Sequence, residues 1–216
     1  MVDDAAVGWK NARDMIEVHT LSAAGLGLLA GGLHALSGPD HLAGVAPFAA
    51  EEGRRAWLVG LAWGLGHTSG ALAAAALALV LRFWIPGIEA QVSSISDRLV
   101  GVLMCALGAV GLHAAFSALP RLHAPRSSVF ALGLFHGAGG LAHLFAVLPA
   151  LGFSGFVSPA LYLAGYAIAS LACVIAFAAG IGLLAPESRP GARRGLLCAA
   201  SALSVVVGCI WLVRPA

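Results

Sequence analysis

Long runs of apolar residues, separated by short polar or turn-forming clusters, dominate the chain. About twenty apolar residues in a helix cross a hydrocarbon core about 30 Å thick, so each run is long enough to span a membrane. The predicted spans are 21–48, 56–83, 97–119, 129–150, 157–185 and 195–213. Trp57, Trp84 and Trp211 fall near ends of these runs, where the amphipathic indole ring prefers the headgroup level. The pattern predicts an all-α integral membrane protein of about six transmembrane helices.

Residues 1–20 differ from the rest because charged side chains interrupt them and no apolar core is present. They lack the apolar stretch of a signal peptide. We expect a polar segment that lies at the membrane interface as a weakly amphipathic helix, with Trp9 against the lipid.

The composition agrees with a protein surrounded by lipid. Hydrophobic residues make up 60% of the 216 residues and charged residues only 10%, with a mean hydropathy of +0.92. A net charge of +2 is too small to indicate a nucleic-acid surface, so the bilayer is the expected partner. The loops between spans place seven arginines on one side: Arg54, Arg55, Arg121, Arg126, Arg189, Arg193 and Arg194. Five basic residues fall on the other side, and this excess predicts a multi-pass protein of the cell (inner) membrane with both termini outside the cytoplasm.

An internal repeat at an offset of 102 residues divides the chain into two halves. The matched pairs are His34 with His136, Gly38 with Gly140, His41 with His143, Leu42 with Leu144, Val45 with Val147, and Pro47 with Pro149. We therefore expect two three-helix repeats, 21–119 and 129–216, joined by a loop at 120–128. Because each repeat has an odd number of spans, the second copy must be inverted in the membrane, as in many transporters.

Both repeats carry helix-breaking residues between their two histidines. Gly38-Pro39 interrupts the first span and Gly139-Gly140 the fourth. Proline cannot donate its backbone hydrogen bond, and glycine weakens a helix. Broken helices at membrane depth survive where protein or a polar cavity satisfies the freed backbone groups. The sequence thus predicts broken first and fourth helices around a site at the bilayer midplane.

Imidazole and carboxylate groups gather in these spans, and this ligand set suits a divalent transition metal. The candidate metal ligands are His34, Asp40, His41, His67, His136 and His143. Residues seven apart on an unbroken helix are roughly 10 Å apart along its axis. Whether His34 and His41 bind one ion together or serve successive stations is left open by the sequence. No tightly bound cofactor is expected, since the metal would be the transported substrate.

Other polar residues have a structural interpretation beside a functional one. Thr68 and Ser69 could support His67, and Tyr162, Tyr166 and Ser170 could line the cavity or simply pack. The remaining histidines, His19, His113 and His123, are expected at interfaces or in a loop. The cysteines, Cys105, Cys173, Cys198 and Cys209, stand singly with no CxxC pair and are expected to act as small buried apolar residues.

The segments HALSGPDHLAGVAP from His34 and WGLGHTSG from Trp63 resemble the nickel/cobalt transporter superfamily, particularly its shorter urease-accessory-like branch. That family has a His-x4-Asp-His signature on one helix and a Leu-Gly-His-Ser-Thr-like signature on the next. Leu65 to Ser69 match the second signature, whereas here five residues separate His34 from Asp40. The resemblance implies metal-pathway roles for Asp40, His41 and His67.

We therefore expect a non-enzymatic permease for nickel or cobalt. Neutral imidazoles bind metal and protonated ones do not, so transport should weaken as the pH falls through the histidine range. The alternatives are an exporter of a small anion or amino acid, a thiol-redox electron conduit, and a structural subunit. No ATP-binding motif is present in the sequence, so an ion gradient or a separate subunit would supply energy. Homo-oligomerisation and transport direction stay open.

Overall fold

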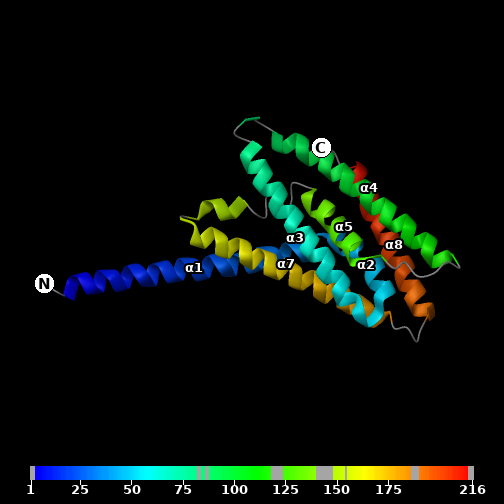
Figure 1. Cartoon of the computed structure of the whole chain (residues 1–216), viewed down its shortest axis with the longest axis horizontal. Helices are drawn as coiled ribbons and strands as arrows, with labels where there is room; N and C mark the ends of the chain where they lie inside the picture. Colours follow the sequence, from blue (N-terminus) through cyan, green and yellow to red (C-terminus); the bar gives the residue numbers. More distant parts are fainter. Residues whose placement is uncertain are drawn as a thin grey trace.

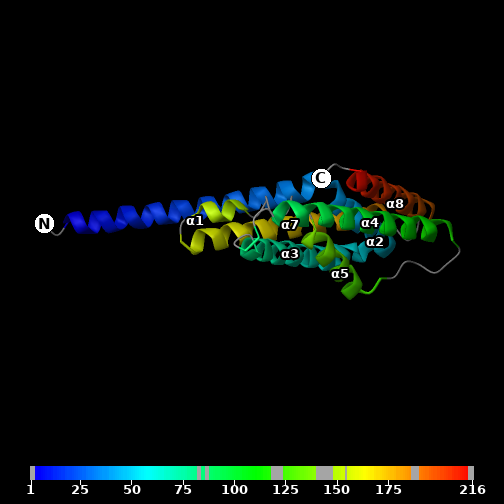
Figure 2. The ribbon, with the colours of Figure 1, turned by 90° about the horizontal axis from the view of Figure 1, so that it is seen from above.

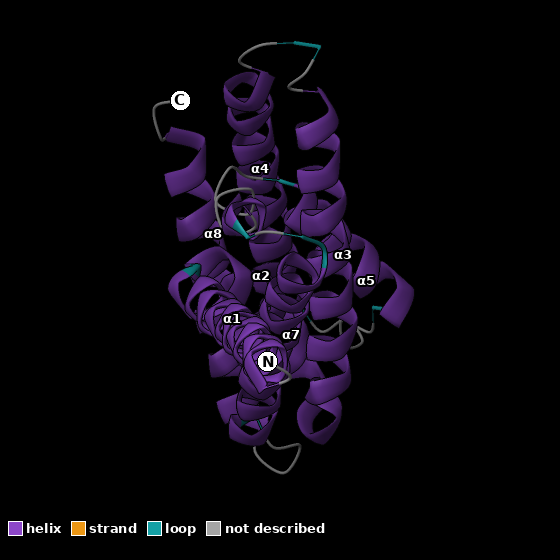
Figure 3. Cartoon of the chain, turned by 90° about the vertical axis from the view of Figure 1, so that its left-hand side faces the viewer, coloured by secondary structure: helices purple, strands orange, loops and turns teal. Residues whose placement is uncertain are grey.

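The structure is a computed structural model that describes residues 3–81, 84–85, 88–117, 124–139, 148–153, 155–185 and 190–213. The regular secondary structure in these ranges is entirely helical (Figure 3). In the first half the helices are α1 (Asp3–Ser37), α2 (Pro39–Glu52), the 3-10 helix η1 (Gly53–Arg55), α3 (Ala56–Leu81) and α4 (Ile88–Phe116). In the second half they are α5 (Arg126–Ala138), the 3-10 helix η2 (Leu148–Gly152), α7 (Val157–Leu184) and α8 (Pro190–Val213) (Figure 1).

Several helices are long and apolar enough to cross a bilayer. Among the described residues, four stretches qualify: Thr20–Ser37, Asp97–Phe116, Val157–Leu184 and Pro190–Val213. Helix α3, the second predicted span, has 26 residues, about 39 Å of helix and long enough to cross a bilayer, and it carries His67-Thr68-Ser69 near its centre. The fourth span is described as a helix only as far as Ala138.

The distribution of polar and apolar side chains is inside out compared with that of a water-soluble protein. Large apolar side chains such as Leu33, Leu99, Ile168 and Ile210 are more than half exposed. The buried polar and charged residues are Asp40, His41, Glu51, His67, His136, Ser170, Ser201 and Ser204. Broad apolar surfaces of this kind are stable against lipid and not against water. The protein is thus an all-α membrane protein, and the predicted fold class is confirmed.

The N-terminal segment, predicted as an interfacial helix, is helical and continuous with the first span. Residues 3–20 form the first part of α1 (Asp3–Ser37). Apart from Gly8, this stretch contains neither glycine nor proline, so nothing in it ends the helix. The N-terminal half of α1 extends past the other helices (Figures 1 and 2). The polar-to-apolar change near residue 20 therefore falls within one continuous helix.

The predicted break in the first span is present, and in the fourth span the described helix ends at the predicted position. Gly38 has an extended backbone (φ −90°, ψ 95°) and separates α1 from α2, which begins at Pro39. Gly139 is also extended (φ −91°, ψ 141°) and ends α5. The breaks follow from Pro39, whose nitrogen cannot donate a hydrogen bond, and from adjacent glycines in the second copy. Residues 140–147 of the fourth predicted span lie outside the described ranges, and its last residues, 148–150, belong to η2.

The first helix of the first half packs against the second helix of the second half. A Cβ atom on Gly27 would overlap the carbonyl of Tyr162, and one on Gly31 would overlap the carbonyl of Tyr166. Four residues further along α1, from Gly27 to Gly31, the contacted residue on α7 is also four residues further along, from Tyr162 to Tyr166. Helices α1 and α7 therefore run parallel. Glycine is required at these positions because the two backbones touch.

The repeat-related pair, α5 of the second half and α3 of the first half, has the same geometry. A Cβ atom on Gly133 would overlap the carbonyl of Trp63, and one on Gly137 that of His67. Helix α5 therefore runs parallel to α3, as α1 does to α7. Each half thus places its first helix beside the second helix of the other half.

The third helices of the two halves, α4 and α8, pack against each other in antiparallel orientation. Gly101 on α4 lies beside Gly208 on α8. Gly108 is seven residues after Gly101, and it lies beside Ser201, which is seven residues before Gly208. An axis in the membrane plane that exchanges α1 with α5 and α7 with α3 would also exchange α4 with α8. These pairings are those of two inverted three-helix repeats.

Helix α2 is tied to α8 by a buried hydrogen bond. Pro47 lies inside α2 and cannot donate to the carbonyl of Ala43, four residues earlier. The Ser204 hydroxyl of α8 donates to that carbonyl instead, at 2.6 Å. The bond satisfies a backbone group that the proline would otherwise leave unpaired in the interior.

Ion pairs hold the other end of α2. Glu52 accepts a hydrogen bond from Arg126 at the start of α5, with 2.7 Å between Oε2 and Nη2. Glu51 lies 4.0 Å from Arg193 near the start of α8. The segment that follows the helix break is therefore attached to both neighbouring helices of the second half. Helix α5 begins at Arg126, inside the linker predicted at 120–128.

Candidate metal-ion site

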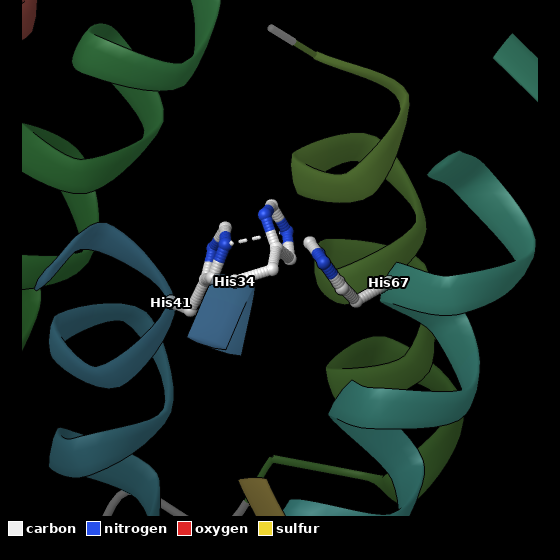
Figure 4. Close-up of side chains that lie close together, drawn as sticks. All are labelled: His34, His41 and His67. Carbon is white, nitrogen blue, oxygen red and sulfur yellow. Dashed lines mark hydrogen bonds between the residues drawn. The ribbon is translucent and has the colours of Figure 1, made fainter. Parts of the chain in front are cut away.

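The break between α1 and α2 brings two histidines together. The Nε2 atoms of His34, in the last turn of α1, and His41, in the first turn of α2, lie 3.0 Å apart (Figure 4). An unbroken helix would hold them roughly 10 Å apart. The break thus settles their relative position, which the sequence left open: the two imidazoles belong to one cluster.

Asp40 and the second half complete one side of this cluster. The Nδ1 atom of His41 shares a hydrogen bond of 2.8 Å with Nε2 of His136, from α5. The carboxylate of Asp40 lies 3.6 Å from His41 Nδ1 and 3.4 Å from His136 Nε2. The carboxylate is therefore close enough to compensate a positive charge on an imidazole or on a bound cation.

His67 of α3 closes the other side. Its ring centroid lies 4.6 Å from that of His41, 5.9 Å from that of His34 and 5.5 Å from that of His136. Figure 4 shows the rings of His34, His41 and His67 gathered between their helices. The close approach of Gly137 to the carbonyl of His67 allows α5 to bring His136 this near.

The cluster lies in the protein interior. Asp40, His41, His67 and His136 are 4%, 3%, 2% and 0% exposed, and His34 is partly buried. A buried carboxylate at membrane depth costs several kcal/mol unless it is paired or bound to a cation. Five ionisable groups from four helices are therefore a feature that helix packing alone does not require.

The donor atoms form two groups with metal-ligand spacing. Those of His34, His41 and His67 all lie within 4.8 Å of one another, and so do those of Asp40, His41 and His136. Imidazole nitrogen and carboxylate oxygen bind Ni²⁺, Co²⁺ and Zn²⁺ well. The structure thus brings together five of the six predicted ligands, and His143 lies outside the described residues.

Two aromatic residues support the cluster in equivalent ways. The ring centroid of Tyr166 on α7 lies 5.6 Å from that of His34, at 41° between planes. The ring centroid of Trp63 on α3 lies 5.6 Å from that of His136, at 42°. Each aromatic ring packs on a histidine from the opposite half. From the sequence, Tyr166 could line a cavity or simply pack, and the only signal for Trp63 was its position one turn before His67.

The remaining candidates lie apart or contribute less directly. Ser170 and Tyr162 are buried on α7, as expected of a face that includes Tyr166. Thr68 has a buried hydroxyl with no hydrogen-bond partner among the described residues, whereas Ser69 is exposed. His113 is exposed and shares a hydrogen bond with Ser117, as expected for a residue at a span end. The side chains of His19 and His123 lie outside the description.

The prediction for the cysteines was partly wrong. Cys105, Cys173 and Cys198 are partly buried, but Cys209 is exposed on α8. All four are free thiols. The Sγ atoms of Cys105 on α4 and Cys209 on α8 lie 3.9 Å apart, and neither cysteine belongs to the two metal-ligand groups. The reason for the difference is that α8 presents apolar and weakly polar residues to lipid as well as to its neighbours.

Fold and site define an all-α membrane protein with a buried histidine and aspartate cluster between two inverted halves. The chain is 30% identical over 225 aligned positions, which cover 94% of it and 58% of the relative, to Chloroplast protein FOR GROWTH AND FERTILITY 2 of Arabidopsis thaliana. It is 29% identical over 187 positions, 75% of the chain and 50% of the relative, to Chloroplast protein FOR GROWTH AND FERTILITY 1 of the same plant.

The chain therefore spans about half the length of the curated relatives it matches. No protein-family model matches it. No solved structure gives a significant match. The names of the two relatives specify a compartment and a biological role but no substrate.

Proposed function

We propose that this protein is a permease that carries a divalent transition-metal ion, nickel or cobalt, across the membrane. One observation supports this most strongly: donor atoms of His34, His41 and His67, and of Asp40, His41 and His136, lie close enough together to hold a metal ion. They lie in a buried region between helices that are otherwise apolar. The resemblance to the nickel/cobalt transporter superfamily points to the same substrate class.

The chemistry of the cluster disfavours the alternative of an anion exporter. Imidazolium groups could attract an anion, but the carboxylate of Asp40 lies 3.4 Å from His136 and 3.6 Å from His41. A negative charge at this position repels an anionic substrate and attracts a cation. A thiol-redox conduit would need paired cysteines at the site, and the positions in the described part of the cluster are occupied by histidine and aspartate.

The transport cycle would use neutral imidazoles. Each would replace a water ligand of the incoming ion, while Asp40 would compensate part of its charge. The energy would come from an ion gradient or from a separate subunit. We propose the cell's inner membrane as the location, with both termini on its non-cytoplasmic side.

The test is the nickel and cobalt content of whole cells. Cells that express the wild type are compared, at matched membrane abundance, with cells that express an Asp40→Ala, His41→Ala double variant. His113→Ala is the control, because His113 is an exposed histidine at the end of α4. We expect wild type and His113→Ala to shift metal content equally, upward for an importer and downward for an exporter. The double variant should match empty-vector cells.

A wild type that leaves nickel and cobalt content at the empty-vector level would contradict the proposal. Measuring sulfite and amino-acid efflux from the same cells would then test the exporter alternative. A wild type and a double variant that shift metal content equally would show that the cluster is not the transport site.

A further inference from the structure

The five described ligand side chains do not converge on one point. Donor atoms bonded to a single ion at about 2.1 Å lie at most about 4.2 Å apart. Even with a limit of 4.8 Å, the described donors divide into two groups of three that share His41. No group in the described part of the chain unites all five. In this conformation an ion can be held by one group or by the other.

The two groups use different nitrogens of the shared ring. Nε2 of His41 faces His34 at 3.0 Å, whereas Nδ1 faces His136 at 2.8 Å and Asp40 at 3.6 Å. A neutral imidazole has one protonated nitrogen and one free lone pair, so it can bind a metal through only one nitrogen at a time. Occupation of one group therefore excludes occupation of the other while the ring keeps its proton.

The internal repeat accounts for this arrangement. His34 and His136 are the repeat-related pair, 102 residues apart, and they approach opposite nitrogens of His41. Each packs against an aromatic ring of the opposite half at the same centroid distance of 5.6 Å. The inverted halves thus supply two similar half-sites around one residue.

We propose that His41 is the common ligand of two successive metal stations on the transport path. The imidazole station consists of His34, His41 and His67, and the carboxylate station consists of Asp40, His41 and His136. The inference rests on the proposed transport of a divalent transition metal. It adds that the ion passes between the stations as His41 exchanges one coordinating nitrogen for the other, while the ring proton moves to the nitrogen that the ion leaves.

The two ligand sets define a substrate class. Three neutral imidazoles favour borderline ions such as Co²⁺, Ni²⁺ and Zn²⁺ and bind hard ions such as Mg²⁺ and Ca²⁺ poorly, since those prefer oxygen. The carboxylate station compensates charge and is less discriminating. Passage through both stations therefore selects borderline divalent ions, and the imidazole station sets the selectivity.

The experiment is Co²⁺ titration of the purified full chain in detergent micelles by calorimetry. The variants are His41→Ala, His67→Ala, His136→Ala and the His67→Ala, His136→Ala double variant, with His113→Ala as control. We expect one ion per chain at saturation for the wild type. Each single change at His67 or His136 should leave affinity within about tenfold of wild type, because one station survives. His41→Ala and the double variant should lose more than about a hundredfold, because neither station keeps three ligands.

Visible absorption of bound Co²⁺ gives an independent readout. The His136→Ala variant keeps three imidazole ligands, whereas His67→Ala keeps two imidazoles and a carboxylate, so their spectra should differ. Asp40→Asn should give the spectrum of His136→Ala, because it also disables the carboxylate station. The His67→Ala and His136→Ala variants should each bind Co²⁺ and yet fail to transport it.

The outcomes separate this inference from the proposed function. If His67→Ala and His136→Ala each weaken Co²⁺ binding as much as His41→Ala, all ligands act on one ion, and the two-station inference is wrong while the metal permease stands. If the wild type binds neither Co²⁺ nor Ni²⁺, both are wrong. Circular dichroism and gel filtration of each variant separate loss of a ligand from loss of the fold.

Discussion

The Nε2 atoms of His34 and His41 lie 3.0 Å apart, although seven residues separate the two histidines along the chain. The extended backbone of Gly38 and the start of a new helix at Pro39 produce this contact. A continuous helix would leave the two rings on one face but roughly 10 Å apart. The break in the first span is therefore what assembles the site, and its own residues become targets for mutation.

Gly38→Ala should weaken metal binding without unfolding the protein. Alanine can adopt the backbone conformation of Gly38, but its Cβ would lie 2.6 Å from Cδ2 of His41 and 2.9 Å from Oδ1 of Asp40. Both ligands must then move. We expect a loss of Co²⁺ affinity of about tenfold or more, measured by calorimetry in micelles.

Gly32→Ala is the matched control for that change. Gly32 also lies near the end of α1, but apart from its own stretch of helix backbone, no atom of the described residues lies within 4 Å of the position of its Cβ. Its affinity for Co²⁺ should equal that of the wild type. Equal affinity in Gly38→Ala would show that the orientation of His41 and Asp40 does not determine binding.

Ser204→Ala should destabilise the protein through α2. The Ser204 hydroxyl donates at 2.6 Å to the carbonyl of Ala43, which Pro47 cannot satisfy from within the helix. Loss of this partner leaves a buried acceptor, at a cost of about 1–3 kcal/mol in the free energy of unfolding. Chemical denaturation in micelles measures the change.

A double-mutant cycle with Pro47→Ala tests that cause. Alanine restores the backbone N–H at residue 47 and hence a donor for the carbonyl of Ala43. Ser204→Ala should therefore cost less in the Pro47→Ala background than in the wild type. Equal costs in both backgrounds would mean that Ser204 stabilises the protein by another route.

Gly31→Ala should destabilise the packing of α1 on α7. Its Cβ would overlap the backbone carbonyl of Tyr166, and a backbone cannot turn aside as a side chain can, so the two helices would have to separate. Overpacking of this kind costs about 1–3 kcal/mol and should lower the temperature of unfolding in micelles. Gly25 is on the same helix, and no described residue outside its own stretch of helix backbone lies within 4 Å of the position of its Cβ. Gly25→Ala should therefore leave that temperature unchanged or slightly raised. Similar unfolding temperatures for the two variants would contradict the close contact.

Replacement of all four cysteines by alanine should leave metal transport intact. The closest pair, Cys105 and Cys209, lies between α4 and α8 with 3.9 Å between its sulfur atoms, and no cysteine belongs to either metal-ligand group. Nickel and cobalt accumulation should therefore equal that of the wild type at equal membrane abundance. Loss of accumulation in a folded cysteine-free variant would revive the thiol-redox alternative.

Much of the fold could be predicted because membrane spans are encoded locally. The length and apolarity of each run predicted the positions of the spans. Pro39 and the paired glycines at 139–140 predicted where helices are interrupted. The ends were less predictable. Helix α4 begins at Ile88, before the predicted start at 97, and α1 begins at Asp3, because a helix can continue into water wherever no residue ends it.

The site was predictable in its members and not in its arrangement. Repetition and the rarity of polar groups in the spans identified His34, Asp40, His41, His67 and His136. The aromatic residues that contact the histidines could not be predicted, because a tryptophan or tyrosine in a membrane span is equally well explained by helix packing. Only the pairing of α1 with α7 and of α5 with α3 showed that Tyr166 and Trp63 lie on the two histidines.

By itself, the sequence determined that this chain lies in a membrane, that it is duplicated, and which side chains are costly to bury. These are properties of residues and their spacing, and each is set by transfer into lipid or by a missing backbone donor. Which nitrogen of His41 faces which partner was decided only by the tertiary structure. That depends on how closely the glycine faces let backbones from the two halves approach, a distance that no local pattern contains.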